Sequence, residues 1–294
     1  MAGATVLEQR GVVRIGGADA RPFLQGLISN DITKVTPAHS IYATLLTAQG
    51  RFLHDFLVSQ SGDELLLELA RERRADLVKR LTLYRLRSQV TVTPDDTLAV
   101  AAAWPDDALA PLGLPASPGA TVARAGGVVL VDPRLPALGA RLVVPRERLD
   151  EALAGLARAP YADYERHRRR LGVPETGDEL VVEKSILLEN GIDELNGVDW
   201  QKGCYVGQEL TARTKYRGLI KKRLLPVAID GPAPPPGTPV TLGEREAGEL
   251  RSAADGIGLA LLRLEMVDAA VLEGEPLRAG AARLTVQRPD WMKF

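Results

Sequence analysis

Residues 202–213 read Lys-Gly-Cys-Tyr-Val-Gly-Gln-Glu-Leu-Thr-Ala-Arg and contain the one cysteine of the 294-residue chain. Residues 206–214 have helix-forming character, with Glu209 in the early turns, so Cys204 is expected near a helix N-terminus. The helix dipole and the ammonium of Lys202 would both stabilise a thiolate there. Because a lone cysteine is often an inert buried side chain, the pattern leaves open whether this thiol is reactive or packed.

Upstream of this stretch, strands and helices alternate in two sets. The first set has strands expected at 11–15, 42–47, 52–58, 64–69 and 90–92, with helices at 19–28, behind a possible Asp19 cap, and at 70–86. The second set is weaker, with strands at 98–104, 127–131 and 141–144 and a helix at 146–157. Each set indicates an α+β unit.

Downstream of residue 220 the pattern changes to short apolar runs at 224–229, 239–242, 257–262 and 283–286, separated by glycine and proline turns. The proline-rich residues 231–237 are interpreted as a rigid loop inside this region. The sequence thus predicts a region 1–220 with two α+β units, either consecutive or interleaved, and a small all-β domain at 221–294.

Composition excludes several classes of protein. The formal net charge of −1 gives no global positive field, so nucleic acid is not expected as a partner. One cysteine permits no internal disulfide and cannot supply all the thiolates that usually hold an iron-sulfur cluster. The three histidines lie far apart, so no metal site is expected. No leader pattern and no apolar run of about 20 residues is present, so a cytosolic or processed chain without membrane contact is expected.

Alternation along residues 52–58 places Asp55 between Leu53 and Leu57 on one strand face and His54 on the other, so His54 and Asp55 cannot form a dyad. A carboxylate between leucines either meets backbone or arginine donors or serves as a functional acid or base. Three basic stretches, 71–87, 166–170 and 215–223, are solvated faces or sites for a polyanion, and no aromatic platform favours RNA.

The 202–213 stretch is similar to the signature K-G-C-Y-x-G-Q-E of the YgfZ-type family, folate-dependent proteins of iron-sulfur cluster assembly and repair in bacteria and mitochondria. Segments 23–31, 49–55 and 258–262 also resemble family segments, in family order, so the resemblance covers nearly the whole chain. It implies two ferredoxin-like α+β units and a C-terminal β-barrel, an aminomethyltransferase-like arrangement around a central folate-sized cavity.

The family is related to the tetrahydrofolate-dependent aminomethyltransferase of glycine cleavage. The resemblance places Asp55 at the transferase's catalytic aspartate and Tyr42 at a pterin-contacting tyrosine. It implies catalytic roles for Cys204, Lys202 and Asp55, and folate contacts from Tyr42, Asp55, Asn30, Tyr205, Gln208, Glu209 and Arg213. Two departures weigh against simple aminomethyl transfer. Arginines near residues 168–172 replace a segment whose carboxylate holds the pterin, and the Lys-Gly-Cys motif is foreign to the transferase.

The resulting hypothesis is an accessory factor that binds tetrahydrofolate or a derivative and uses Cys204 in the assembly or repair of 4Fe–4S clusters, with no permanently bound metal. Its partners would be cluster carriers or scaffolds and client enzymes, in the bacterial cytoplasm or the mitochondrial matrix. Turnover is left open. The alternatives are a folate-dependent one-carbon transferase or demethylase, with Asp55 orienting or protonating the amine, and a non-catalytic scaffold whose basic stretches form the interface.

Overall fold

The computed structural model describes residues 2–218 and 220–294. The chain divides into two compact units, each discontinuous in sequence. The first comprises Met1–Ala48, Leu53–Tyr164 and Leu195–Gln208, and the second comprises Gln49–Phe52, Glu165–Glu194 and Glu209–Phe294.

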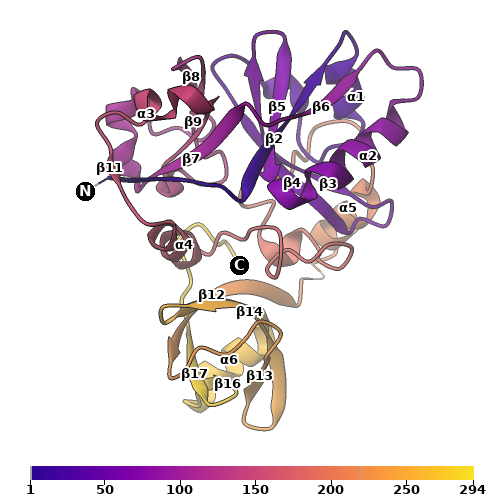
Figure 1. Cartoon of the computed structure of the whole chain (residues 1–294). Coiled ribbons are helices and arrows are strands. Elements are labelled where there is room, and N and C mark those ends of the chain that lie inside the picture. The colour runs from indigo at the N-terminus through magenta and orange to yellow at the C-terminus, as the bar shows by residue number, and fades with distance from the viewer. Residues whose placement is uncertain (1, 219) are drawn as a thin grey trace. The chain divides into compact units, whose positions relative to one another are not determined.

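The first unit contains a five-stranded sheet in the order β3-β4-β5-β2-β6 (Figure 1). Its strands are β2 (Arg10–Gly16), β3 (Ile41–Leu46), β4 (Phe52–Ser61), β5 (Glu64–Ala70) and β6 (Thr91–Asp95). Every residue of β3 is buried, so its apolar run fills the core on both faces. Helix α1 (Ala20–Gln25) and helix α2 (Arg74–Arg85) accompany this sheet, and α2 packs against β2 and β6.

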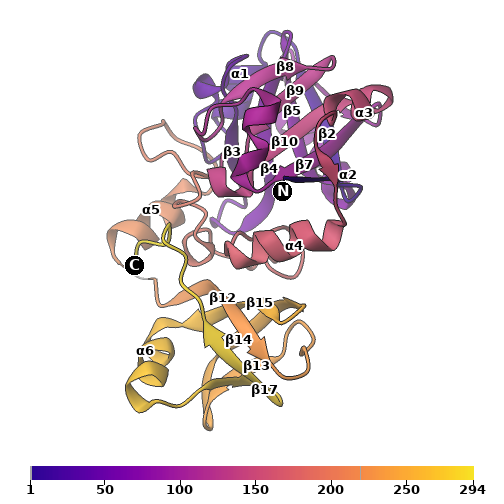
Figure 2. The same cartoon turned by 90° about the vertical axis from the view of Figure 1, so that its left-hand side faces the viewer.

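A second sheet in the same unit has the order β11-β1-β7-β10-β9-β8 (Figure 2). Its strands are β1 (Gly3–Val6), β7 (Leu98–Trp104), β8 (Thr121–Arg124), β9 (Gly127–Val131), β10 (Ala140–Pro145) and β11 (Ala157–Arg158). Strand β1 joins this sheet while β2, which follows it directly, joins the other, so the N-terminal segment interleaves the two sheets. Helix α3 (Leu149–Ala152) packs on β10.

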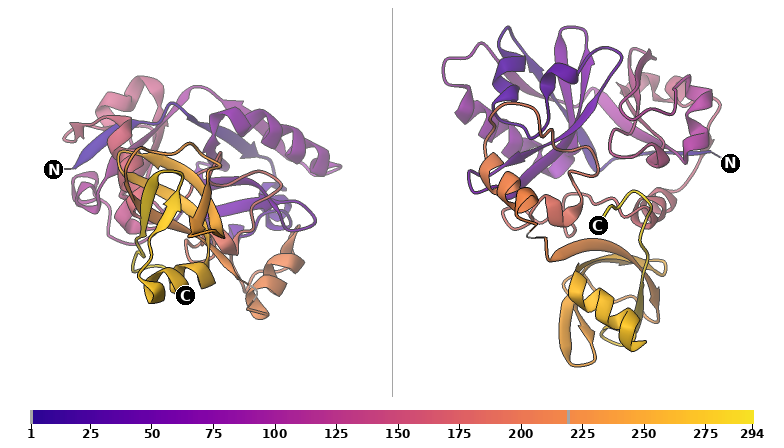
Figure 3. Two further views of the ribbon diagram at one scale, coloured as in Figure 1. Left: turned by 90° about the horizontal axis from the view of Figure 1, so that it is seen from below. Right: turned by 180° about the vertical axis from the view of Figure 1, so that it is seen from behind.

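The second unit contains a closed barrel in the order β12-β15-β14-β13-β16-β17. Its strands are β12 (Lys222–Asp230), β13 (Pro239–Leu242), β14 (Arg245–Ala254), β15 (Ile257–Arg263), β16 (Leu277–Ala279) and β17 (Ala282–Val286). Pairing of β12 with β17 closes the barrel, whose interior is apolar, and α6 (Leu264–Glu273) packs beside β15 (Figures 2 and 3). The proline-rich loop joins β12 to β13 inside this domain, as predicted.

Two further helices, α4 (Tyr161–Arg170) and α5 (Gln208–Tyr216), each run from one unit into the other. Short 3-10 turns occur at Ile32–Lys34, Arg71–Arg73, Asp106–Ala108, Ala110–Leu112, Pro136–Leu138, Arg146–Arg148 and Leu188–Asn190. The predicted α+β class with a C-terminal β-barrel is therefore confirmed.

Several predicted boundaries are wrong. The helix expected at 146–157 is only α3, which is followed by Gly155 in the left-handed region at φ +86°. Helix α5 starts at Gln208, after Gly207 at φ +82°, and not at residue 206. The Asp19 carboxylate accepts no bond from its own helix and instead accepts one from the Gln89 amide at 2.7 Å. The elements that were not predicted are strands β1, β8, β11, β14 and β16 and helices α4 and α6.

Candidate functional site

A cavity of about 260 Å³ lies within the first unit, where the loops of its two sheets meet. Its walls mix apolar surfaces with amide, hydroxyl and imidazole groups, which suits a flat polar ring. The lining residues are Asn30, Lys34, His39, Ser40, Ile41, Tyr42, Pro118, Pro133, Asn196 and Val198. Two of the residues predicted to bind folate, Asn30 and Tyr42, are thus brought together in one cavity.

Asn30 organises one wall of this cavity. Its side-chain amide donates to the backbone carbonyls of Tyr42 and Asn196, both at 2.8 Å, and its Oδ1 accepts from the Asp31 amide. Asn196, at φ +60°, donates in turn to the Pro133 carbonyl at 3.0 Å. These bonds tie segments from distant parts of the chain into one wall.

Asp55 lies behind Tyr42. Its side chain is 2% exposed, and its Oδ2 accepts a hydrogen bond from the Tyr42 hydroxyl at 3.1 Å. Burial and the neighbouring Asp55 charge hold the pKa of Tyr42 well above its usual range, so the tyrosine stays protonated and donates. Tyr42 lines the cavity, and Asp55 is hydrogen-bonded to the hydroxyl of this tyrosine. The catalytic role of Asp55 stays a prediction.

His54 points to the opposite side of the strand, as the alternation predicts. Its Nε2 lies 2.8 Å from Oδ2 of Asp76 on helix α2. Burial lowers the pKa of His54 to about 4, so the ring is neutral at pH 7.

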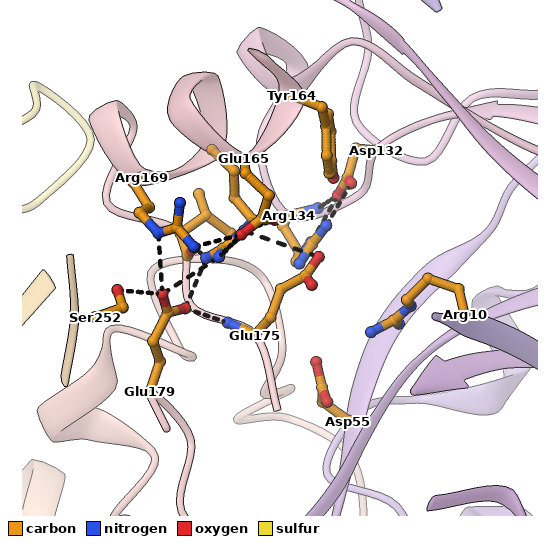
Figure 4. A network of polar contacts seen from close by, with 12 residues as sticks. Arg10, Asp55, Asp132, Arg134, Tyr164, Glu165, Arg169, Glu175, Glu179 and Ser252 are labelled. Carbon is orange, nitrogen blue, oxygen red and sulfur yellow. Dashed lines mark hydrogen bonds and ion pairs between the residues drawn. The ribbon is translucent and has the colours of Figure 1, made fainter. Parts of the chain in front are cut away.

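A chain of buried ion pairs lies beneath Tyr42. The Arg134 guanidinium is 5.7 Å from the Tyr42 ring centroid and bonds Asp132 at 2.7 Å. Arg141 reaches Asp132 at 3.3 Å and Glu68 at 3.7 Å, and Glu68 also pairs with Arg10. Three arginines in this network thus face Glu68, Asp132 and the nearby Asp55, which balances the buried charge. Figure 4 shows Arg10, Asp55, Asp132 and Arg134.

The segment that carries Cys204 is hydrogen-bonded to the last residue of α1 and to residues that follow this helix. The Lys202 ammonium donates to the backbone carbonyls of Gln25, Ile28 and Asn30 at 2.8, 2.5 and 2.9 Å. All three ammonium protons are therefore used, and the same Asn30 lines the cavity. We call this set of bonds the Lys202 latch.

The latch gives Lys202 a structural role. Burial lowers its pKa to about 8, while the three carbonyls stabilise the ammonium form. Asp199 supports the same turn by accepting from the Gln201 and Lys202 amides at 2.7 and 3.0 Å. The ammonium is aimed at these carbonyls, so its expected action on the Cys204 thiol stays a prediction.

Cys204 itself is exposed, which excludes a packed thiol. It lies four positions before the first residue of α5, farther from the helix than predicted. A Cβ built on Gly203 meets no atom within 4 Å, so this glycine is not required by packing.

The other residues predicted to bind folate are divided between the units. Tyr205 is buried, with its ring centroid 5.1 Å from the Lys202 ammonium, and Gln208 ends the first unit. Glu209 and Arg213 belong to the second unit and form an exposed i,i+4 ion pair with each other at 2.7 Å. Their predicted folate contacts remain predictions.

The second unit contains its own buried charge cluster, on and after α4 (Figure 4). Arg168 is buried and bonds Glu165 at 2.9 Å and Glu179 at 2.6 Å. Glu179 also accepts from the Ser252 hydroxyl of the barrel at 2.6 Å, and Arg169 bonds Glu165 at 2.6 Å. The interpretation of residues 166–170 as a solvated basic face is therefore wrong for Arg168, because its charge is neutralised inside the unit.

Within residues 2–218 and 220–294, no three His, Cys, Asp or Glu side chains gather in a way that could hold a metal ion. Among the same described residues, no helix combines the length and apolar character needed to cross a bilayer.

The fold and the barrel define the class of protein. The structure superimposes on the crystal structure of glycine cleavage system aminomethyltransferase T from Bartonella henselae with a TM-score of 0.77 and 14% identity, over 99% of this chain and 86% of that one. Residues 221–294 match the family model for the C-terminal beta-barrel domain of CAF17. The chain thus has an aminomethyltransferase-like fold with a CAF17-type barrel.

Sequence relatives refine this class. The chain is 35% identical over 303 residues to the mitochondrial iron-sulfur cluster assembly factor IBA57 of Homo sapiens, covering 97% of this chain and 84% of the relative. It is 33% identical to the Mus musculus protein, covering 97% and 84%, and 33% identical to the Neurospora crassa homolog, covering 93% and 72%. The chain belongs to the IBA57 family. The predicted kinship with iron-sulfur assembly factors is confirmed, although these relatives are named IBA57 rather than YgfZ.

Several residues of the candidate site were missed in the sequence. Lys34, His39 and Asn196 line the cavity but sit in no motif. The Asn196-Gly197 pair is an ordinary turn signal, and nothing in its local sequence indicates a cavity wall. Partners as distant as Arg10 and Glu68 are joined only by strand pairing of β2 with β5.

Proposed function

We propose that this protein acts in the assembly or repair of iron-sulfur clusters, in particular 4Fe–4S clusters, as a tetrahydrofolate-binding accessory factor that uses Cys204. The observation that carries the proposal is the identity of 33% and 35%, over 97% of the chain, to relatives named as iron-sulfur cluster assembly factors. The relatives are also named as mitochondrial, which favours the mitochondrial matrix over the bacterial cytoplasm as the location.

The exposed thiol supports a role in handling cluster or sulfur. Cys204 stands on a turn that the Lys202 latch and Asp199 hold in place, so the thiol is presented from a fixed backbone. Because iron-sulfur clusters are usually held by several thiolates, one cysteine requires the remaining ligands to come from a partner. We therefore expect cluster carriers, scaffolds and client enzymes as partners.

The cavity supports folate binding in part. Pockets for drug-sized ligands span roughly 300–1,000 Å³, so a cavity of about 260 Å³ would take the pterin ring and leave the glutamate tail outside. Asn30, Ser40 and Asn196 would pair with the edge of the ring, and Tyr42 would lie against it. Bound tetrahydrofolate would supply a carrier for one-carbon units.

Anaerobic calorimetric titration with tetrahydrofolate tests this cavity. Wild-type protein should bind saturably, and Val198→Phe, which fills the cavity wall, should lower affinity at least about tenfold, or ~1.4 kcal/mol. Val271→Phe on the exposed face of α6 is the control and should bind like wild type. If wild type shows no binding, the folate part of the proposal fails and the assembly role is unaffected.

The alternative function is a folate-dependent one-carbon transferase or demethylase, and the buried Asp55–Tyr42 hydrogen bond beside the cavity favours it. Under this alternative, methylenetetrahydrofolate forms from a candidate amine, and Asp55→Asn abolishes turnover while Cys204→Ser retains it. The opposite pattern supports the assembly role.

The assembly role is tested in cells that lack their own member of the family. Expression of this chain should restore the activity of 4Fe–4S enzymes, while a cluster-free enzyme serves as the reference. Failure to restore these activities with normal protein abundance would contradict the proposal.

A further inference from the structure

The C-terminal end of α2 and the residues after it carry a local positive charge, whereas the whole chain is nearly neutral. Residues 77–93 contain Lys79, Arg80, Arg85 and Arg87 and no Asp or Glu, while the complete chain has a formal net charge of −1. In the left panel of Figure 3, this end of α2 stands clear of neighbouring ribbons.

Large apolar side chains lie exposed at the same place. Leu83 is 68% exposed, Tyr84 46% and Leu86 88%. Leu86 follows the last residue of α2 and has φ +44°, a conformation that costs free energy for a branched side chain. Residues 82–87 are all exposed, so none of these side chains contributes to the core. Residues 79 and 83–87 are called the α2 tip.

The cations of α2 divide into two groups. Around the first turns of the helix, Arg73, which directly precedes α2, and Arg80 bond Asp76 at 2.9 and 2.8 Å. At the α2 tip, Lys79, Arg85 and Arg87 have no carboxylate partner among the described residues. Arg85 only reaches the Val90 carbonyl at 3.3 Å. The guanidinium groups of the tip therefore remain available for carboxylates from outside.

We infer that the α2 tip is a docking surface for a protein partner with an acidic contact face. Lys79 and Leu83 are four residues apart, as are Arg80 and Tyr84, so cations and apolar side chains share one face of the helix. Arginine and tyrosine beside aliphatic anchors are the side chains enriched in protein interfaces. Arginine also binds carboxylates in bidentate fashion.

This mosaic favours a protein over a bilayer. A helix that lies in a membrane surface separates an apolar face from a cationic one, whereas here the two kinds of side chain alternate from Leu83 to Arg87. The proposal goes beyond the proposed function, and it rests on that function only in expecting protein partners.

Site-specific photocrosslinking in the full-length chain tests the proposal. Benzoylphenylalanine replaces Leu83 at the α2 tip or, as the control, Val271, which is 79% exposed on α6 of the second unit. Both proteins are expressed in cells lacking their own family member, and the crosslinked peptides are mapped by mass spectrometry. We expect the Leu83 probe to capture a partner at a peptide rich in Asp and Glu.

Reversing the charge of the arginines at the α2 tip tests whether they bind carboxylates of the partner. R85E/R87E should lower the crosslink yield about tenfold or more, and reversing the mapped carboxylates of the partner should restore it. No specific crosslink at Leu83, a contact peptide without carboxylates, or a yield unchanged by R85E/R87E would each overturn the proposal. Flotation of purified chain with phosphatidylcholine vesicles containing anionic phosphatidylglycerol, lost in R85E/R87E, would overturn it in favour of a bilayer. Because crosslinking does not measure cluster assembly, its failure is distinguishable from failure of the proposed function.

Discussion

Helices α2 and α4 carry arginine-rich stretches that look alike in sequence and have opposite structures. In α4, Arg168 is buried between Glu165 and Glu179. At the end of α2 and just after it, Arg85 and Arg87 are exposed to solvent beside exposed leucines. The difference follows from the neighbouring acids, since carboxylates lie 3 and 11 residues from Arg168 and none lies between residues 77 and 93. The arginines of a basic stretch are therefore buried only where the fold places carboxylates beside them as ion-pair partners.

The largest expected effect on stability concerns Arg168, the buried arginine of α4. Arg168→Met removes the buried cation that bonds both Glu165 and Glu179 and leaves Arg169 to balance the two carboxylates, which should lower the free energy of unfolding of the second unit by about 3–5 kcal/mol. Chemical denaturation measures the change. Arg170→Met, at an exposed position of the same helix, should change it by less than about 0.5 kcal/mol. Equal effects of the two substitutions would contradict the assignment.

The second-largest expected effect concerns α2 at Asp76, whose carboxylate is hydrogen-bonded to the buried His54 ring. Burial lowers the pKa of His54 from 6.5 to about 4, so the unfolded chain takes up a proton between these pH values and the folded chain does not. This part of the stability is complete above pH 6.5 and is lost as pH falls toward 4, by up to about 3 kcal/mol. His54→Gln should remove it, so the stability difference between wild type and variant should shrink on acidification between these pH values. A difference independent of pH would refute the linkage.

A smaller effect is expected at the Lys202 latch, a buried cation held by carbonyls instead of carboxylates. Lys202→Met leaves three backbone carbonyls without their donor, which should cost about 1–3 kcal/mol. The rate of amide hydrogen exchange of residues 199–206 should also increase in this variant. Gly203→Ala is the matched control in the same turn and should leave both measurements unchanged, because its Cβ meets no atom.

The smallest effect on stability is expected at the α2 tip. Arg85→Ala combined with Arg87→Ala removes cations that pair with no carboxylate of the described chain, so the free energy of unfolding should change by less than about 0.5 kcal/mol. A loss comparable to that of Arg168→Met would show that these arginines are structural.

The sequence predicted most of the fold because its signals are local. Apolar runs such as residues 52–58 and 224–229 became strands with nearly the expected bounds. The helix at 146–157 and strands β1, β14 and β16 were mispredicted or missed, since alanine-rich or polar segments take their structure from sheet partners. Strand β1, for example, is fixed by its pairing with β7.

The candidate site was predictable only where a motif marked it. The motif singled out Cys204, and the structure decides between the two alternatives that the sequence left open, since the thiol is exposed and not packed. The partners of Lys202 could not be predicted, because the carbonyls of Gln25, Ile28 and Asn30 lie more than 170 residues away and carry no side-chain signature. The buried pairing of Arg168 was also hidden, since its sequence resembles a solvated face.

The most direct test of the central claim is replacement of Cys204 by serine in cells that depend on this chain for their 4Fe–4S enzymes. Cys204→Ser should lose most of the supported enzyme activity at normal protein abundance, while Gly203→Ala in the same turn keeps it. If Cys204→Ser supports these enzymes as well as wild type, the thiol has no part in the function and the account of this site is wrong.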